Sequence, residues 1–296
     1  MKRLPAMVVL FAVGMGLIFL IWPRPEAALT ESQPLLCYVG GTMTPVFEEL
    51  AAACKKENGT TVEVTTADSG ELLATIEMQL RGDLYVAHDP FMYRVMDRGL
   101  GVSAWHVGDL SPVMVVQKGN PKNIHSLKDL LRPDVKVYLT DYQHSTLGNM
   151  LPTIFKRGGI DFEEFNKSKE ILTHRSGSWV ANQVIMKSAD AALVWQVVAK
   201  LRKENLDIVP ITNCLPRPGI DGITSATGKY YTLAPVKVSV MTLTCSKRPQ
   251  ACEKFINFVR SEAGKEIVRK HGFDVDDHYG TCHYLNGVLQ EVNYKQ

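Results

Sequence analysis

Four short turns of the chain place glycine, serine and threonine residues where a helix is expected to begin. They lie at residues 40–45, 67–70, 141–148 and 175–180. The first N–H groups of a helix have no partner inside it, and the helix dipole makes that end positive, so such a turn can bind an anion. The hydroxyls add neutral donors. Each hydroxyl can equally cap its own helix, but four turns together suggest an anion site.

Each of these turns follows a predicted strand. Apolar or alternating runs predict strands over residues 35–39, 60–66, 83–87, 135–140, 170–174 and 191–195. Helical spacing of apolar residues predicts helices over residues 45–58, 69–80, 147–157 and 178–186, with Thr44 as the N-cap of the first, and Asp89-Pro90 opens a further one. Such alternation is typical of an α/β fold with parallel sheets, in which ligands bind beyond the carboxyl ends of the strands.

The same pattern predicts two lobes with two crossover strands. Residues 112–116 form one crossover, and residues 230–242 form a second long strand after a loop over 214–228. Helices follow near 251–260 and 264–270, and the tail from residue 273 is polar and irregular. We therefore expect a two-lobed fold with a ligand cleft between the lobes. Lobe one comprises residues 33–112 plus 231–296, and lobe two comprises residues 113–230.

The first 28 residues are typical of an export segment. Lys2 and Arg3 precede an uncharged run over residues 6–22, and Pro23 and Pro25 end it. This order of parts is that of a secretory signal peptide. The run is also long enough to be kept as a membrane anchor. In both interpretations the rest of the chain is exported to the periplasm, free or tethered to the inner membrane.

Composition and motifs exclude several classes of protein. The 296 residues include 33 Lys+Arg and 31 Asp+Glu, a net charge of +2 that gives no support for nucleic-acid binding. No nucleophile elbow, zinc-protease motif or P-loop occurs, so we expect no enzyme, no cofactor and no metal site. Export permits disulfides among the six cysteines. Cys245 and Cys252 flank a probable turn and are the best candidates for a pair, whereas Cys37 and Cys54 can equally be buried thiols.

Three other groups have two interpretations each. His88 beside Asp89 is either a ligand or a neighbour of a helix start. Arg175 is either a bidentate partner for a carboxylate or phosphate, or a surface arginine. The tail contains Asp, His and Cys residues, which are metal-ligand types, but their spacing matches no standard site.

Several blocks of the sequence resemble the periplasmic molybdate-binding proteins of ABC importers, within the type 2 solute-binding proteins. The similarity spans about residues 35–273. It rests on residues 41–43, 68–72, 82–89, 189–195, 234–236 and 254–273.

The resemblance implies a tetrahedral oxyanion such as molybdate or tungstate, held by neutral donors of both lobes. It implies hydroxyl donors at Thr42 and Ser69, backbone donors at Leu147 and Val180, and Trp195 where the family has a tyrosine. Trp195 and Asp68 depart from the family pattern. These departures leave another small anion or a metal chelate as an alternative ligand. A retained anchor leaves a membrane-bound ligand sensor as an alternative function. The implied partner is an ABC-type permease, and we expect a monomer.

Overall fold

The computed structural model describes residues 33–142, 145–217, 220–224, 230–232, 235–285 and 288–289. The chain divides into two units, Met1–Gln33 and Pro34–Gln296. The predicted export segment, residues 1–28, lies outside the described residues. Within the described ranges, no helix is long and apolar enough to span a membrane.

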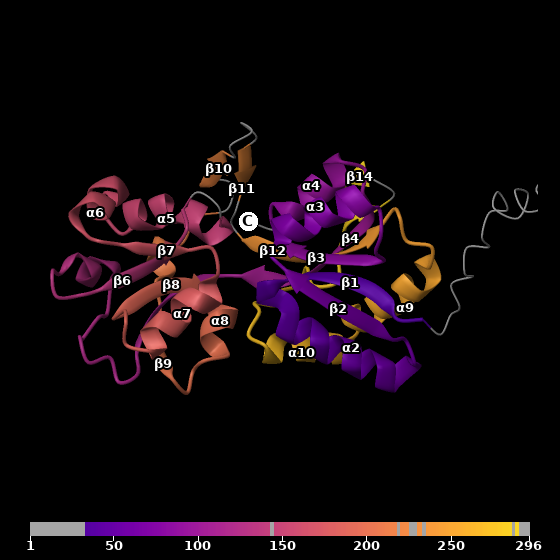
Figure 1. Cartoon of the computed structure of the whole chain (residues 1–296), viewed down its shortest axis with the longest axis horizontal. Coiled ribbons are helices and arrows are strands. Elements are labelled where there is room, and N and C mark those ends of the chain that lie inside the picture. Colours follow the sequence, from indigo (N-terminus) through magenta and orange to yellow (C-terminus); the bar gives the residue numbers. More distant parts are fainter. Residues whose placement is uncertain are drawn as a thin grey trace, which may run out of the picture. The chain divides into compact units, whose positions relative to one another are not determined.

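Two separate sheets organise the chain from Pro34 onward (Figure 1). The first lobe is built on a seven-stranded sheet in the order β14-β13-β4-β12-β3-β1-β2. Its strands are β1 (Leu35–Gly40), β2 (Val62–Ala67), β3 (Leu84–His88), β4 (Gly101–Leu110), β12 (Val236–Leu243), β13 (Cys282–Leu285) and β14 (Val288–Leu289). β1 runs parallel to β2 and β3, whereas β12 is antiparallel to β3 and β4.

The helices of the first lobe bury one apolar stripe each. They are η1 (Gly41–Met43), α2 (Thr44–Asn58), α3 (Ser69–Gln79), α4 (Phe91–Asp97), α9 (Pro249–Arg260) and α10 (Glu262–Lys270). In α2 the buried Phe47, Leu50 and Cys54 recur at helical spacing, and the helix ends at Gly59 in the left-handed region (φ +79°). Thr44 is the first residue of α2 and not its cap, because the preceding residue is already helical.

The second lobe is built on a five-stranded sheet in the order β7-β6-β8-β5-β9. Its strands are β5 (Pro112–Gln117), β6 (Val137–Thr140), β7 (Leu172–His174), β8 (Ala191–Trp195) and β9 (Leu206–Val209). Its helices are η2 (Leu127–Leu131), α5 (Thr146–Arg157), α6 (Phe162–Ser168), α7 (Gly177–Ile185), α8 (Gln196–Lys200) and η3 (Thr212–Cys214). β6 lies parallel to β7 and β8. The two-lobed α/β fold is therefore confirmed, while the exact limits of each lobe stay a prediction.

Two sequence expectations between the lobes are wrong. Residues 214–228 are not simply a loop, because β10 (Gly222–Thr224) pairs antiparallel with β11 (Tyr230–Thr232). The long strand expected over residues 230–242 is divided, and β12 begins only at Val236. Pro235 has no N–H to donate to a strand ladder, so one uninterrupted strand is not expected to run through it.

The polar tail and the segment before the first crossover also differ from expectation. Residues 101–110 form β4, and β13 of the tail pairs with it in the seven-stranded sheet. His106 is fully buried on β4 and meets the buried His283 of β13 edge to face, with ring centroids 5.4 Å apart. Because β4 and β13 contain polar residues, their sequences do not show the apolar runs that predict a strand.

The cysteine pair expected at Cys245 and Cys252 is not formed. All six cysteines are free thiols. Cys245 Sγ donates to the Gly82 carbonyl (3.4 Å), and Cys252 Sγ donates to the Asp83 carbonyl (3.7 Å). Both thiols therefore point to the end of the loop before β3, and neither points to the other.

A single residue, Ser111, separates β4 of the first sheet from β5 of the second. Its N–H donates to Gln196 Oε1 (2.5 Å). Gln196 Nε2 donates in turn to the Asp109 carbonyl (3.2 Å) and to Asp274 Oδ2 (3.1 Å). Asp274 Oδ2 also accepts a hydrogen bond from Ser111 Oγ (2.6 Å). Gln196 therefore joins the start of α8, the crossover and the C-terminal segment; we refer to these contacts as the Gln196 junction.

Replacing Gln196 tests the contribution of this junction. The side chain is buried, with 4 % exposure, so Gln196→Ala leaves the Ser111 N–H without its partner and the Asp109 carbonyl with the Asp274 N–H alone. We expect a loss of about 1–3 kcal/mol in the free energy of unfolding, measured by urea denaturation. The exposed Gln79→Ala serves as the matched control, and equal stability of the two variants would contradict the prediction.

Candidate functional site

The strands of both sheets end at one cavity. It has a volume of about 800 Å³ and is lined by residues of both lobes. Its walls come from the loops and helix starts that follow β1, β2, β3, β6, β7 and β8. This is where ligands of open α/β sheets bind, and the volume falls within the range of about 300–1,000 Å³ usual for small-molecule sites.

Four of the five predicted site residues line this cavity. Thr42 and Ser69 lie on the first lobe, and Leu147 and Trp195 on the second. Val180 is not brought to it: the residue is fully buried inside α7, and its N–H donates to the Ser176 carbonyl (3.1 Å). The position assigned to Val180 is three residues deeper in α7 than Gly177, which does line the cavity.

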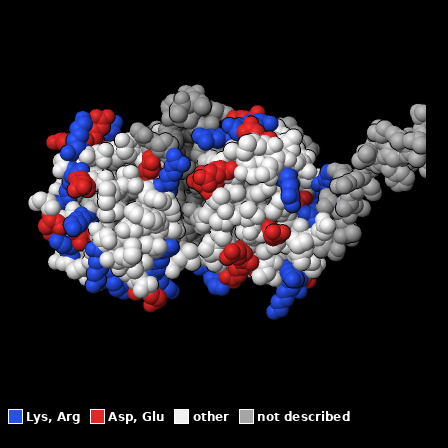
Figure 2. Space-filling view, viewed as in Figure 1, with Lys and Arg blue, Asp and Glu red and all other residues white. Residues whose placement is uncertain are grey.

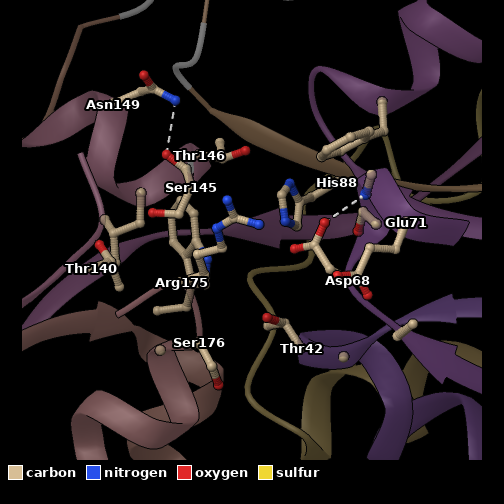
Figure 3. Close-up of a pocket in the computed structure, with 18 of the residues that line it drawn as sticks. Thr42, Asp68, Glu71, His88, Thr140, Ser145, Thr146, Asn149, Arg175 and Ser176 are labelled. Carbon is tan, nitrogen blue, oxygen red and sulfur yellow. Dashed lines mark hydrogen bonds between the residues drawn. The ribbon is translucent and has the colours of Figure 1, made fainter. Parts of the chain in front are cut away.

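The side chains at three helix starts cap their own helices. Asp68 Oδ1 accepts the Gly70 N–H (2.8 Å) before α3 (Figure 3), and Ser145 Oγ accepts the Gly148 N–H (2.9 Å) in α5. Ser176 Oγ accepts the Trp179 N–H (3.3 Å) in α7. The capping interpretation is therefore right for these side chains, which are already engaged as acceptors.

One buried hydroxyl of the cavity has no partner. Thr140 is the last residue of β6, has 2 % exposure and lines the cavity. Its Oγ1 makes no hydrogen bond to any described residue. An unpaired buried polar atom costs about 1–3 kcal/mol, which a ligand oxygen would offset. Thr140 is not among the predicted site residues, although its place at the end of a predicted strand, just before a glycine-containing turn, is a signal that the sequence offers.

Charged side chains also line the cavity. Asp68 and Glu71 belong to the start of α3, Arg94 to α4 and Arg175 to the loop before α7. The lining of the cavity is therefore not restricted to neutral donors, and which of its residues hold a ligand stays a prediction. Within the described part of the chain Arg175 forms no ion pair, and Figure 3 shows its side chain directed into the space between the two walls. Arg94 gave no sequence signal because it lies inside a helix.

The loop that carries Arg175 is held in place by aromatic stacking. The ring of His174 stacks on Trp179, with centroids 4.5 Å apart and an angle of 21°. His174 Nδ1 accepts the Ser176 N–H (3.0 Å), which turns the chain toward α7. Trp179 also packs against Tyr138 at 5.9 Å. The backbone on either side of Arg175 is thus fixed, while its side chain stays exposed to the cavity.

An aromatic group forms the third part of the wall. The ring of His88 lies 5.7 Å from that of Phe91 and 6.2 Å from that of Trp195, the residue expected at the site. Burial lowers the pKa of His88, which favours the neutral ring. His88 Nδ1–H can donate to the Asp89 carbonyl (2.8 Å). His88 therefore adds shape and apolar surface rather than a fixed positive charge.

Asp89, behind this wall, links the two lobes. Its carbonyl accepts a hydrogen bond from Thr146 Oγ1 of α5 (3.3 Å). Its own carboxyl is buried, and burial raises its pKa to about 7. Oδ2 accepts the Lys237 N–H (3.3 Å), whereas Oδ1 has no partner among the described residues. Asp89 thus belongs to the support of the site.

The described residues contain no group of three or more His, Cys, Asp or Glu side chains that could hold a metal ion. The acidic and histidine side chains of the tail are used elsewhere. Asp274 belongs to the Gln196 junction, and Asp276 Oδ2 lies 2.9 Å from His278 Nδ1. Structural contacts account for both aspartates.

The fold and the position of the cavity define a solute-binding protein. The chain belongs to the family of bacterial extracellular solute-binding proteins, whose family model matches residues 35–274. The resemblance indicated by the sequence blocks is thereby confirmed.

Individual relatives are distant. A molybdate-binding protein ModA from Mycobacterium bovis is 22% identical over 253 residues, covering 84% of this chain and 87% of the relative. The solved substrate-binding domain of a putative molybdenum ABC transporter from Clostridium difficile has 17% identity and a TM-score of 0.62, covering 82% of this chain and 99% of that one. A PEB3 structure with L-phospholactate bound has 18% identity and a TM-score of 0.63, with coverage of 82% and 100%. At these identities the solved structures show the fold alone.

Gly40 allows Ser69 to approach the end of β1. A Cβ built at Gly40 would lie 2.4 Å from Ser69 Oγ and 2.7 Å from Met43 Cε. Gly40→Ala must therefore displace one of them, and we expect a destabilisation of about 1–3 kcal/mol in urea unfolding. At Gly41 the nearest atom to a Cβ is 3.9 Å away, so Gly41→Ala is the matched control. A Gly40→Ala protein as stable as this control would show that the contact is not tight.

Proposed function

We propose that this solute-binding protein captures a small ligand through an oxyanion group, between its two lobes, and delivers it to the permease of an ABC importer. The observation that carries the proposal is the Arg175 guanidinium, which points into the cavity without an ion pair to a described residue, beside the buried, unpaired hydroxyl of Thr140. Arg175 and the starts of α5 and α7 lie on the same wall. Hydroxyl, guanidinium and helix amides are all donors, and an oxyanion supplies the acceptors that they lack.

The proposed mechanism is binding followed by closure. Thr42 and Ser69 would approach the ligand from the first lobe, and Thr140, Arg175 and Leu147 from the second. A ligand that contacts both walls stabilises the closed state by its differential affinity for that state. The permease would then recognise the closed form, and the ligand would leave chemically unchanged.

Different features of the protein support two kinds of ligand. Molybdate and tungstate are supported by the sequence blocks and by the names of the ModA relatives. Another small ligand with an anionic group is favoured by the two arginines of the cavity, whereas its two carboxylates disfavour an inorganic dianion. Trp195 favours it too, because its indole N–H is placed differently from the hydroxyl of a tyrosine.

The proposed place of action is outside the inner membrane. The family consists of extracellular proteins, and the basic-apolar-proline order of residues 1–28 supports export. We propose a monomer that is either released by signal cleavage or tethered by the retained segment. N-terminal sequencing of the exported protein distinguishes these two forms.

A thermal-shift panel tests the proposed function. A ligand that binds only the folded state adds about 2.7 kcal/mol of stability at one hundred times its Kd. We expect millimolar molybdate, tungstate, sulfate, phosphate or small organic oxyanions to raise the melting temperature in at least one case, with neutral sugars as the control. An absence of any shift across the anions would rule out the proposal.

Thr140→Val tests the assigned subsite. Valine has nearly the same shape as threonine but no hydroxyl, so the bound anion loses one donor. We expect the affinity of the anion found in the panel to fall about tenfold by calorimetry. The stability of the unliganded protein should hold or rise, because the unpaired atom is removed. Thr173→Val on β7, outside the cavity lining, is the control, and equal affinities of the two variants would displace the subsite from Thr140.

A further inference from the structure

The two walls of the cavity carry opposite charge. On the second lobe the lining includes Arg175 and no carboxylate. On the first lobe it includes both carboxylates, Asp68 and Glu71, which outnumber the single arginine of that wall, Arg94. In the space-filling view basic atoms at the second lobe face acidic atoms at the first across the hollow (Figure 2). The cavity is therefore dipolar along the line that joins the lobes.

The donors of the second-lobe wall form an anion subsite. Thr140 Oγ1 is buried without a partner, and the N-terminal turns of α5 and α7 open toward the same space as Arg175. α5 has 12 residues and α7 has 9, so both have a developed N-terminal turn. An oxyanion group placed here has a partner for each of these donors.

The carboxylates of the first-lobe wall are acceptors without donors. Asp68 uses Oδ1 to cap α3, and no hydrogen bond to Oδ2 is formed within the described residues. The Glu71 carboxylate likewise has no partner in the described part of the chain. An inorganic dianion that touches both walls would meet these carboxylates with repulsion. A cationic donor would instead make charge-assisted hydrogen bonds to them.

We infer that the ligand is a small organic molecule with an oxyanion group at one end and an amino group at the other. Its oxyanion would lie on Thr140 and Arg175, and its amino group on Asp68 and Glu71. The carbon chain between them would contact the aromatic wall at Phe91. The inference rests on the proposed function, because it assumes that this cavity binds an oxyanion, and it adds what the rest of the ligand must be.

Two matched pairs of compounds test the inference on the full chain by calorimetry. Phosphoethanolamine is compared with ethyl phosphate, and β-alanine with propionate; the members of each pair differ by the amino group. Molybdate is the inorganic probe. We expect the amino compound of at least one pair to bind about tenfold tighter or more than its partner and tighter than molybdate.

Substitutions assign the effect to the two walls. Asp68→Asn keeps the helix cap, because asparagine caps as well as aspartate does, and it removes the charge. With Glu71→Gln it should weaken the amino compound about tenfold and leave or strengthen the compound without the amino group. Arg175→Ala should weaken both members of the pair alike. Glu63→Gln, an exposed residue of β2 outside the lining, should change neither.

The outcomes separate the inference from the function on which it rests. If molybdate or the amino-free compounds bind at least as tightly as the amino compounds, the inference is overturned and oxyanion capture stands. The same holds if Asp68→Asn changes both members of a pair equally. If no anion of any kind binds the wild-type chain, the proposed function itself fails.

Discussion

The Gln196 junction is the constraint on which the arrangement of the site depends. The crossover from β4 to β5 has only Ser111 between two sheets, and a single extended residue does not set an angle between them. Gln196 holds that residue by its N–H and reaches the Asp109 carbonyl and the Asp274 carboxylate with its amide. The next residue toward the N-terminus is Trp195, which lines the cavity. A contact at the ligand side of β8 is thus one residue away from the hydrogen bonds that hold the crossover.

The cavity keeps several polar groups in a state that would be unfavourable in a closed core. Thr140 has an unpaired hydroxyl, and Asp89, behind the aromatic wall at His88, is buried with a pKa raised by loss of water. Binding sites commonly contain such unfavourable groups. A group whose hydrogen-bond partner is supplied only by the ligand gains more free energy on binding than a group that is already paired. The three capping side chains behave in the opposite way. Asp68, Ser145 and Ser176 are paired within their own turns and contribute mainly by fixing where the free donors lie.

The sequence predicts the elements whose signals are local and misses those that depend on distant contacts. Gly59 ends α2 and Ser69 opens α3 as expected, because a left-handed residue and a helix start are set by neighbouring residues. β4 and β13 were missed because their buried histidines are stabilised by each other and by Asp109, not by an apolar pattern. At the site, four predicted residues line the cavity, namely Thr42, Ser69, Leu147 and Trp195. The place of Thr140 and Arg94 in the cavity wall depends on their neighbours in space, which the sequence pattern does not show. Val180 belongs to the helix that starts at the cavity but lies too deep in α7 to line it.

The charge of the whole chain says little about the charge that a ligand meets. The net charge is +2 over 296 residues, and two carboxylates with two arginines leave the cavity lining formally neutral apart from its histidines. Solvent and salt screen exposed charges beyond about 8–10 Å, so a ligand in the cavity responds to the nearest wall and not to the sum. Because the charges are separated between the walls, a cavity lining that is formally neutral can still distinguish between ligands. A dianion gains from one wall and loses to the other, whereas a dipolar ligand gains from both, and closure of the lobes would increase that difference by removing water.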